Sequence, residues 1–343
     1  MLKSVSFAGL LRHGLVLLGF GALAACGGSV SRVETFVPQK MVVFGDEMSL
    51  LPDDGSGKYS INALQADGVT LDCASNLVWP QYLAAHFGLV FKGCPGTATT
   101  FTAEMHAAYS AAGIKVADVV QQVASYRSAG GSFNAKTLFT VQGGMHDIKA
   151  AFDGYVTAGE TVAARSDALA QVEAAGTALG TLVNDMIGGN LADGSCNTAL
   201  GRVLYMSVPN LALSPYGIAQ SAVNVVRGTL LTDLTNAFNS KLRSAVANNG
   251  QCAGPVFADT QVASMANPAV ASTSYVLSDR IHPACTAVLP GCTTKTLQDN
   301  AVTPALFTAT STNYLWADDT HLGPIAHTLI GALAVSRTVN NPF

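Results

Sequence analysis

Short apolar runs alternate along the chain with longer stretches in which apolar residues recur at helical spacing. The short runs are typical of buried strands and cover residues 41–44, 89–93, 137–144, 202–209 and 255–260. The longer stretches predict helices over residues 78–88, 116–131, 160–187, 229–250 and 323–339. This alternation favours an α/β fold in which helices cover both faces of a parallel sheet.

Glycine and polar residues follow three of the expected strands. Residues 45–47 ("GDE") follow the first strand, residues 143–147 ("GGMHD") follow the third, and residues 209–210 ("PN") follow the fourth. In open parallel sheets, ligands bind outside the carboxyl ends of the strands. We therefore expect a functional site where these three segments meet.

The composition is that of a large, weakly charged globular chain. Its 343 residues are 49% hydrophobic and only 12% charged, which is enough for a sizeable core in one large or two small domains. The net charge is −4, and no basic cluster occurs along the chain. Nucleic acid is therefore not expected as a partner.

The first residues have the features of an export signal. Lys3 and Arg12 accompany an apolar run over 14–25, which is too short to span a bilayer. The run ends in "LAAC" (23–26), which resembles a bacterial lipobox, with a plain signal peptide as the alternative. The resemblance implies cleavage before Cys26 and lipidation of its thiol, which would anchor the protein stably in a membrane. Gly27 after the cysteine favours the outer membrane of the cell envelope.

This interpretation divides the chain into three parts. We expect a signal peptide over 1–25, a lipidated tether over 26–39 and a folded domain over 40–343.

The other cysteines predict disulfides. Six of the seven cysteines remain besides Cys26, and an even number in an exported chain indicates pairing. Pairing neighbours along the chain gives Cys73–Cys94, Cys196–Cys252 and Cys285–Cys292, one of many possible connectivities. The segment "HPAC" (282–285) raises metal binding as an alternative. Because no Cys-x-x-Cys pair accompanies it, no metal site is expected.

Seven blocks together resemble the GDSL, or SGNH, hydrolase superfamily. They occur in the family's order and span roughly residues 40–340: "FGDEMSL" (44–50), "DDGSGKYSINA" (53–63), "VWPQYLAAHFGL" (78–89), "LFTVQGGMHDI" (138–148), "YMSVPNLALSP" (205–215), "LTNAFNSKLRSAV" (234–246) and "YLWADDTHLGPIAHTLIG" (314–331). The resemblance implies a flavodoxin-like, three-layer α/β/α sandwich with a parallel sheet. It also implies hydrolysis of ester bonds without a cofactor or metal.

The family's base and its partner match this sequence. The resemblance assigns the base to His321 and its orienting acid to Asp318, three residues earlier. An imidazole that moves protons needs such an acceptor, which fixes its tautomer and stabilises its charged form.

The other family positions depart from the pattern. Glu47 stands where the family has its nucleophilic serine, and His146 stands where it has an oxyanion-binding asparagine. For the oxyanion-binding glycine the sequence offers Gly93 and Gly96, of which Gly96 is preferred. Ser49 is the remaining hydroxyl near the expected nucleophile.

These departures leave two functions open. In the first, the chain hydrolyses a lipid, acyl or acetyl ester, with Glu47 as nucleophile or base and His146 as donor to the oxyanion. Its partners would be an ester-bearing lipid or an acylated glycan, and the membrane that holds Cys26. In the second, Glu47 and His321 form an ion pair that fills a retired site, and the protein binds a lipid, polyester or glycan without reaction.

Overall fold

A computed structural model describes residues 36–108, 110, 113–189, 196–246, 252–270, 277–299 and 308–340. The predicted signal peptide, the proposed lipidation site Cys26 and most of the predicted tether lie outside these residues. Within the described residues, no helix has the length and apolar character needed to cross a membrane.

Five parallel strands form the central sheet: β1 (Lys40–Phe44), β4 (Ala103–Met105), β5 (Thr137–Val141), β6 (Arg202–Met206) and β7 (Ala253–Val256). Their spatial order is β4-β1-β5-β6-β7, so the sheet's second strand lies outside its first. This is the flavodoxin-like order of doubly wound sheets. The predicted α/β/α sandwich with a parallel sheet is confirmed.

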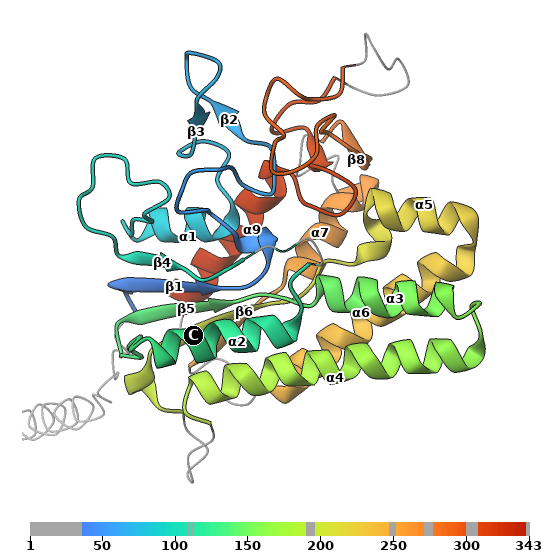
Figure 1. Cartoon of the computed structure of the whole chain (residues 1–343), viewed down its shortest axis with the longest axis horizontal. Coiled ribbons are helices and arrows are strands. Elements are labelled where there is room, and N and C mark those ends of the chain that lie inside the picture. Colours follow the sequence, from blue (N-terminus) through green and yellow to red (C-terminus); the bar gives the residue numbers. More distant parts are fainter. Residues whose placement is uncertain are drawn as a thin grey trace, which may run out of the picture. The chain divides into compact units, whose positions relative to one another are not determined.

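Alternate residues of each strand face opposite layers. Val42 and Phe44 pack toward one face, which is covered by α2 (Val116–Ser128), α3 (Met145–Thr157), α4 (Val162–Met186) and α6 (Val225–Ala245). Met41 and Val43 pack toward the other face, which is covered by α1 (Trp79–His86), α7 (Ala258–Ala266) and α9 (Pro324–Val339). Figure 1 shows these two helical layers on either side of the strands. Because both faces are buried, the strands read as continuous apolar runs.

Smaller elements gather beside this sandwich. The hairpin of β2 (Ala63–Leu64) and β3 (Leu71–Asp72) and the parallel pair of β8 (Asp279–Pro283) and β9 (Tyr314–Trp316) lie outside the main sheet. A separate apolar cluster that includes Tyr59, Ile61 and Tyr314 packs beneath them. Helix α5 (Pro215–Val223) directly precedes α6 in the chain and packs on it.

Two strand predictions need correction. The run over 89–93 is not the second strand of the sheet, because it meets β4 only through a single bridge between Phe91 and Ala103. Its apolar residues are buried as an edge segment, which gives the same sequence pattern as a strand. The run over 255–260 is a strand only to Val256, after which α7 begins at Ala258.

The three predicted disulfides are present. Cys73 joins Cys94, Cys196 joins Cys252 and Cys285 joins Cys292, with Cα–Cα distances of 5.6, 6.1 and 5.9 Å. Neighbour pairing is therefore confirmed for all six cysteines of the folded domain.

Candidate functional site

Glu47 lies in a tight turn at the carboxyl end of β1. A short 3-10 helix spans Glu47–Ser49, and the Asp46 carboxylate caps it by accepting from the Met48 N–H at 3.0 Å. Gly45 and Gln122 tie this turn to α2, because the Gln122 side chain bonds both the N–H and the carbonyl of Gly45. The turn leaves the Glu47 side chain fully buried, at 0% exposure.

Asp318 and His321 form a second tight turn, directly after β9. One Asp318 oxygen accepts from the backbone N–H groups of Thr320 and His321 at 2.8 and 2.7 Å. His321 Nδ1 lies 2.9 Å from each oxygen of the same carboxylate. The backbone bonds hold the carboxylate in place, and the carboxylate in turn orients the ring.

The two turns meet at Glu47. His321 Nε2 lies 3.1 Å from Glu47 Oε1, and His146 Nε2 bonds the same oxygen from the first turn of α3. Asp318, His321, Glu47 and His146 thus form one continuous row of acids and imidazoles, which we call the Glu47 network. Glu47 and His146 follow two of the three strand ends from which a site was expected, whereas Asn210, after the third, caps a short 3-10 helix and donates to Thr232.

The contacts determine the protonation of this network. An ionised carboxylate only accepts hydrogen bonds. His321 faces Asp318 with one nitrogen and Glu47 with the other, so both nitrogens must carry protons and the ring is an imidazolium. Burial opposes this charge, but the bonds to Asp318 and Glu47 outweigh it and raise the pKa of His321 to about 10.

The pKa values of Glu47 and His146 are also shifted by their mutual contacts. Burial would raise the pKa of Glu47, yet the bonds from His146 and His321 lower it to about 2. Burial likewise disfavours charge on His146, but its bond to Glu47 raises its pKa above the ordinary value. At neutral pH the centre therefore holds an ionised Glu47 carboxylate beside a charged His321 ring, and the contact with Glu47 favours the charged form of His146 as well. A serine hydrolase needs the opposite state, a neutral imidazole that can accept a proton.

Asp46 adds a carboxyl group that changes charge near neutral pH. It is fully buried, and its second oxygen accepts from the Gln142 amide at 2.9 Å. Burial, reinforced by the neighbouring charge of Glu47, raises the pKa of Asp46 to about 7. Asp46 supports the turn rather than contacting His321 or His146 by a hydrogen bond.

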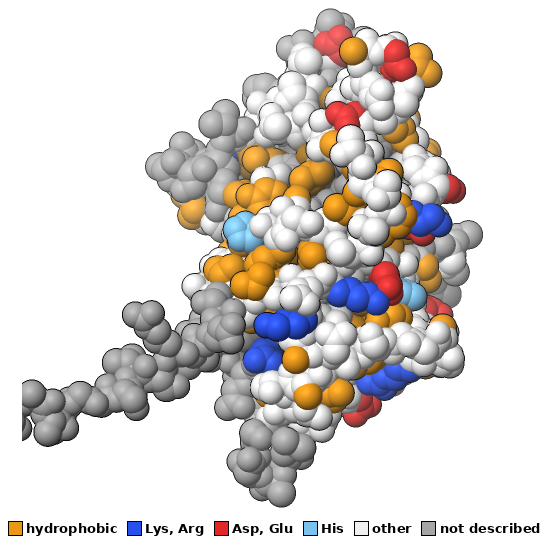
Figure 2. All heavy atoms as spheres, turned by 90° about the vertical axis from the view of Figure 1, so that its left-hand side faces the viewer, with side chains coloured by type: hydrophobic (Ala, Val, Ile, Leu, Met, Phe, Trp, Pro, Cys, Tyr) orange, Lys and Arg blue, Asp and Glu red, His pale blue; other side chains and the backbone are white. Residues whose placement is uncertain are grey.

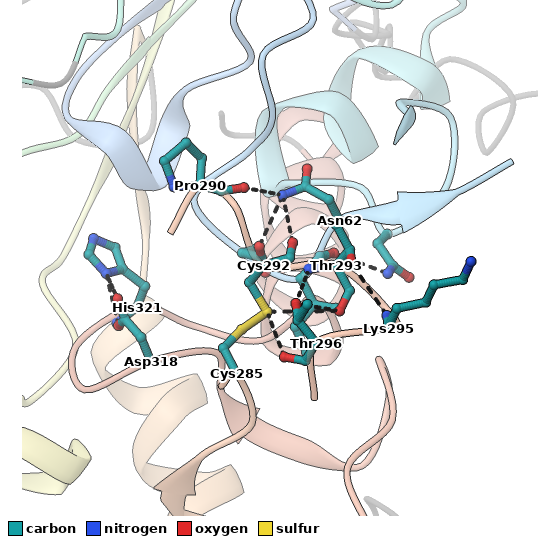
Figure 3. The surroundings of a disulfide bond; sticks show 12 residues. Asn62, Cys285, Pro290, Cys292, Thr293, Lys295, Thr296, Asp318 and His321 are labelled. Atoms are coloured by element: carbon teal, nitrogen blue, oxygen red, sulfur yellow. Dashed lines mark hydrogen bonds and ion pairs between the residues drawn. A yellow bond between two sulfur atoms is a disulfide. The ribbon is translucent and has the colours of Figure 1, made fainter. Parts of the chain in front are cut away.

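A polar loop over residues 57–62 covers His321. The Tyr59 ring lies 5.6 Å from the His321 ring, between centroids, and the Ser60 hydroxyl donates to the Leu322 carbonyl at 2.9 Å. Asn62 holds this loop, because its buried amide donates to Lys58, Ser60, Pro290 and Cys292 carbonyls. Figure 3 shows Asn62 reaching Pro290 and Cys292, with Asp318 and His321 beside the Cys285–Cys292 disulfide.

Ser49 does not belong to the Glu47 network. Its hydroxyl is buried, donates to Gln142 Oε1 at 3.1 Å and accepts from the Trp79 indole N–H at 3.2 Å. These bonds point the side chain toward α1 rather than toward His321. The residue two positions after Glu47 thus serves the packing of the turn.

Gly96 is also far from the position expected of it. It is exposed in the loop that precedes β4, beyond the amino end of that strand, whereas the site lies beyond the carboxyl ends. This loop lies at the left of Figure 1 and therefore on the face shown in Figure 2. There Gly96 lines an apolar pocket of about 250 Å³ together with residues such as Leu77, Leu89 and Phe91. The expectation failed because it rested on treating 89–93 as the second strand.

The glycine that meets the site is Gly113, which the sequence analysis did not select. It follows β4, has a φ of +77°, and a Cβ placed on it would lie 2.2 Å from His146 Nδ1. Only a glycine leaves room for the ring at this point. Correct placement of β4 at 103–105 would have drawn attention to Gly113.

A second turn of the same kind is formed by Asp279 and His282, whose Asp-x-x-His pattern is visible in the sequence. Asp279 accepts from the N–H groups of Ile281 and His282 at 2.8 Å each, and its other oxygen lies 2.8 Å from His282 Nδ1. We call this pair the Asp279–His282 dyad. Its imidazole is 43% exposed, whereas that of His321 is 10% exposed.

Among the described residues, no group of three or more histidine, cysteine or acidic side chains is arranged to hold a metal ion. His282 and Cys285, which raised that possibility, are engaged with Asp279 and with Cys292 respectively.

Comparisons with known proteins reach only distant structures. No protein-family model matches the chain, and no curated protein matches its sequence. A lipase from a goat rumen metagenome aligns with a TM-score of 0.46 at 8% identity, over 89% of this chain and 99% of its own. An extracellular lipase from Streptomyces rimosus aligns with a TM-score of 0.43 at 12% identity, over 88% and 100%. An acetyl xylan esterase from Geobacillus stearothermophilus gives 0.37 at 12%, over 90% and 97%. Likeness at this level does not identify the reaction of this chain.

Proposed function

We propose that the chain is a divergent GDSL-type hydrolase that cleaves ester bonds through the Glu47 carboxylate. The observation that carries this proposal is the contact between His321 Nε2 and Glu47 Oε1 at 3.1 Å, with Asp318 bonded behind the ring. An Asp–His pair that ends on a third reactive group is the arrangement of covalent and general-base hydrolases. Here the third group is a carboxylate.

The charge state suits a reaction driven by an acid and a base together. The Glu47 carboxylate can take a proton from an attacking water, or can itself attack to give an intermediate that a water then hydrolyses, while a charged imidazole donates a proton to the departing group. When the reaction neutralises both groups, the proton can return along the contact between Glu47 and His321. His146 donates to the same Glu47 oxygen and is placed to stabilise negative charge that develops near it.

The substrate and location belong to the same proposal. The family resemblance favours an ester-bearing lipid or an acylated glycan. The lipobox-like segment ending at Cys26 favours a lipid-anchored protein of the cell envelope, held in the outer membrane. Both would bring the domain close to acylated envelope components.

A second candidate is a binding protein without catalysis. The burial of Glu47 favours it, because a carboxylate at 0% exposure that is bonded to two rings fills the site as a closed ion-pair network. In that case the fold would present a lipid, polyester or glycan site at the strand ends without turning it over.

Esterase assays on the domain with p-nitrophenyl acetate and butyrate test the two candidates. For a hydrolase, Glu47→Gln lowers kcat/KM by at least about 10²-fold, while Ser49→Ala and the exposed-dyad control His282→Gln retain activity. Loss of activity in Ser49→Ala, with fluorophosphonate labelling of Ser49, would refute the role of Glu47. No turnover by the natural protein together with turnover by Glu47→Ser would support the binding protein.

A further inference from the structure

The two oxygens of the Glu47 carboxylate have unequal surroundings. Oε1 is bonded by both His146 and His321, whereas Oε2 is buried and has no hydrogen-bond partner among the described residues. Leaving a buried acceptor unsatisfied costs about 1–3 kcal/mol. A network kept only for stability would be expected to satisfy both oxygens.

We propose that Glu47 Oε2 is the attacking atom, and that the substrate is an alkyl ester of a strong oxoacid, such as an alkyl sulfate, attacked at its alkyl carbon. This inference rests on the proposed hydrolase function and specifies its substrate and intermediate. The intermediate is an alkyl ester of Glu47.

The leaving groups favour saturated carbon over a carboxylic ester carbonyl. If a carboxylate adds to the carbonyl of an alkyl ester, the carboxylate is a far better leaving group than the alkoxide, so the adduct reverts. Displacement at saturated carbon has no such return path when the departing group is a stable anion. Carboxylate nucleophiles therefore serve where the leaving group is good.

The first step forms one bond and breaks one. A lone pair of Oε2 forms a bond to the alkyl carbon, the carbon–oxygen bond of the substrate breaks, and its electron pair leaves with sulfate. Glu47 is now an uncharged ester, so His321 has lost one of the two carboxylates that held its second proton. His321 releases that proton to solvent and becomes a neutral base, still oriented by Asp318.

The second step uses the donors already aimed at Oε1. His321 Nε2 takes a proton from water, the water oxygen adds to the Glu47 carboxyl carbon, and the carbonyl electron pair moves to Oε1. The N–H of His146 stabilises this oxyanion. The bond from the carboxyl carbon to Oε2 then breaks, and Oε2 leaves in the alcohol with the proton from His321. The proton of the new carboxyl group returns to His321, so the net reaction of alkyl sulfate and water gives alcohol, sulfate and one proton.

The same geometry indicates how the substrate is recognised. The rings of His321 and His146 are 10% and 17% exposed, whereas Glu47 is fully buried and Asp318, behind His321, is 31% exposed. An anionic sulfate head group would be repelled by Asp318 at His321, so we expect it beside His146, whose carboxylate partner Glu47 is fully buried.

Isotope transfer tests the covalent step in the natural protein. A single turnover of octyl sulfate is run in water enriched in heavy oxygen, and the peptide that contains Glu47 is then analysed by mass spectrometry. We expect heavy oxygen in the Glu47 carboxylate and ordinary oxygen in the octanol. Heavy oxygen in the octanol with none in Glu47 would mean that water attacks the substrate directly, which overturns the proposal.

Two variants check the second step. His321→Gln removes the base, so it should accumulate protein that carries an octyl group on Glu47, with turnover lowered by about 10³-fold or more. His282→Gln changes the other Asp-x-x-His turn and should accumulate no adduct.

p-Nitrophenyl sulfate should not be cleaved, because its aromatic carbon cannot be attacked from the rear.

The substrates separate this inference from the proposed function. Glu47-dependent cleavage of p-nitrophenyl acetate without any cleavage of octyl sulfate would overturn the covalent inference and leave the hydrolase function standing. No cleavage of either substrate would overturn both.

Discussion

The Asp279–His282 dyad and the Asp318–His321 pair are two copies of one local structure with different surroundings. In each, one carboxylate oxygen accepts two backbone N–H groups, and the acid bonds Nδ1 of the imidazole three residues later. The difference is at Nε2, which in His321 meets Glu47 at 3.1 Å. The four-residue Asp-x-x-His motif is thus sufficient to orient a histidine. At His321, a second acid from a distant part of the chain, Glu47, adds a buried contact that favours the charged ring.

The largest difference should appear in the pH dependence of stability. Because the folded-state pKa of His321 is raised to about 10, its contribution is complete below the unfolded value of about 6.5. That contribution is lost as the pH rises from there toward 10. We expect the free energy of unfolding to fall in this window by a few kcal/mol. Glu47→Gln should flatten this fall, because one of the two carboxylates is gone.

Chemical denaturation across this pH window measures the slope, and NMR titration of the His321 ring measures the pKa itself. Asp279→Asn is the matched control, since the His282 ring is 43% exposed and an exposed pair contributes about 0–1 kcal/mol. An equal change of slope in the two variants would show that Glu47 is not what distinguishes the histidines.

A smaller effect is expected from Asn62, which lies on the side of His321. Its amide donates to four carbonyls and holds the loop that places Tyr59 against His321. Asn62→Ala should lower the free energy of unfolding by about 1–3 kcal/mol, because buried carbonyls lose their donors. It should also increase hydrogen exchange in residues 57–62.

Asn313→Ala is a control on the side of the other dyad, where the Asn313 amide donates to Ser278 and Thr308. It should leave the exchange of residues 57–62 unchanged. If Asn62→Ala leaves that exchange unchanged as well, the loop is held by other contacts.

An effect of similar size concerns His146, the second imidazole bonded to Glu47. Gly113→Ala places a Cβ against the His146 ring and should displace it from Glu47, at a cost of about 1–3 kcal/mol. Gly96→Ala is the matched control, because both glycines have positive φ but nothing lies within 4 Å of a Cβ at Gly96. We expect the NMR signals of His146 to shift only in Gly113→Ala. A shift in neither variant would mean that His146 accommodates the methyl group without leaving Glu47.

The sequence predicts site residues best where they follow a strand whose position is predicted correctly. Glu47 and His146 come directly after β1 and β5, and both strands were recognised from their apolar runs. Gly96 was chosen instead of Gly113 because the second strand was placed at 89–93. An edge segment with buried apolar residues has the same pattern as a short strand, so periodicity alone could not distinguish them.

Ser49 shows a different limit of sequence reasoning. Its distance along the chain from Glu47 is fixed, but its direction depends on whether the turn is helical and on what packs beside it. Its hydroxyl is hydrogen-bonded to Trp79 and Gln142, which come from two other parts of the chain.

The sequence by itself determined the alternation of strands and helices, including β1, β5, β6 and β7, and the acids and imidazoles that follow the strand ends. These properties depend on local periodicity and on neighbours along the chain. Only the tertiary structure decided the charge of the site, because that charge depends on distances between Asp318, Glu47 and two rings from separate segments. Burial then strengthens each of those contacts, since little water remains to screen them.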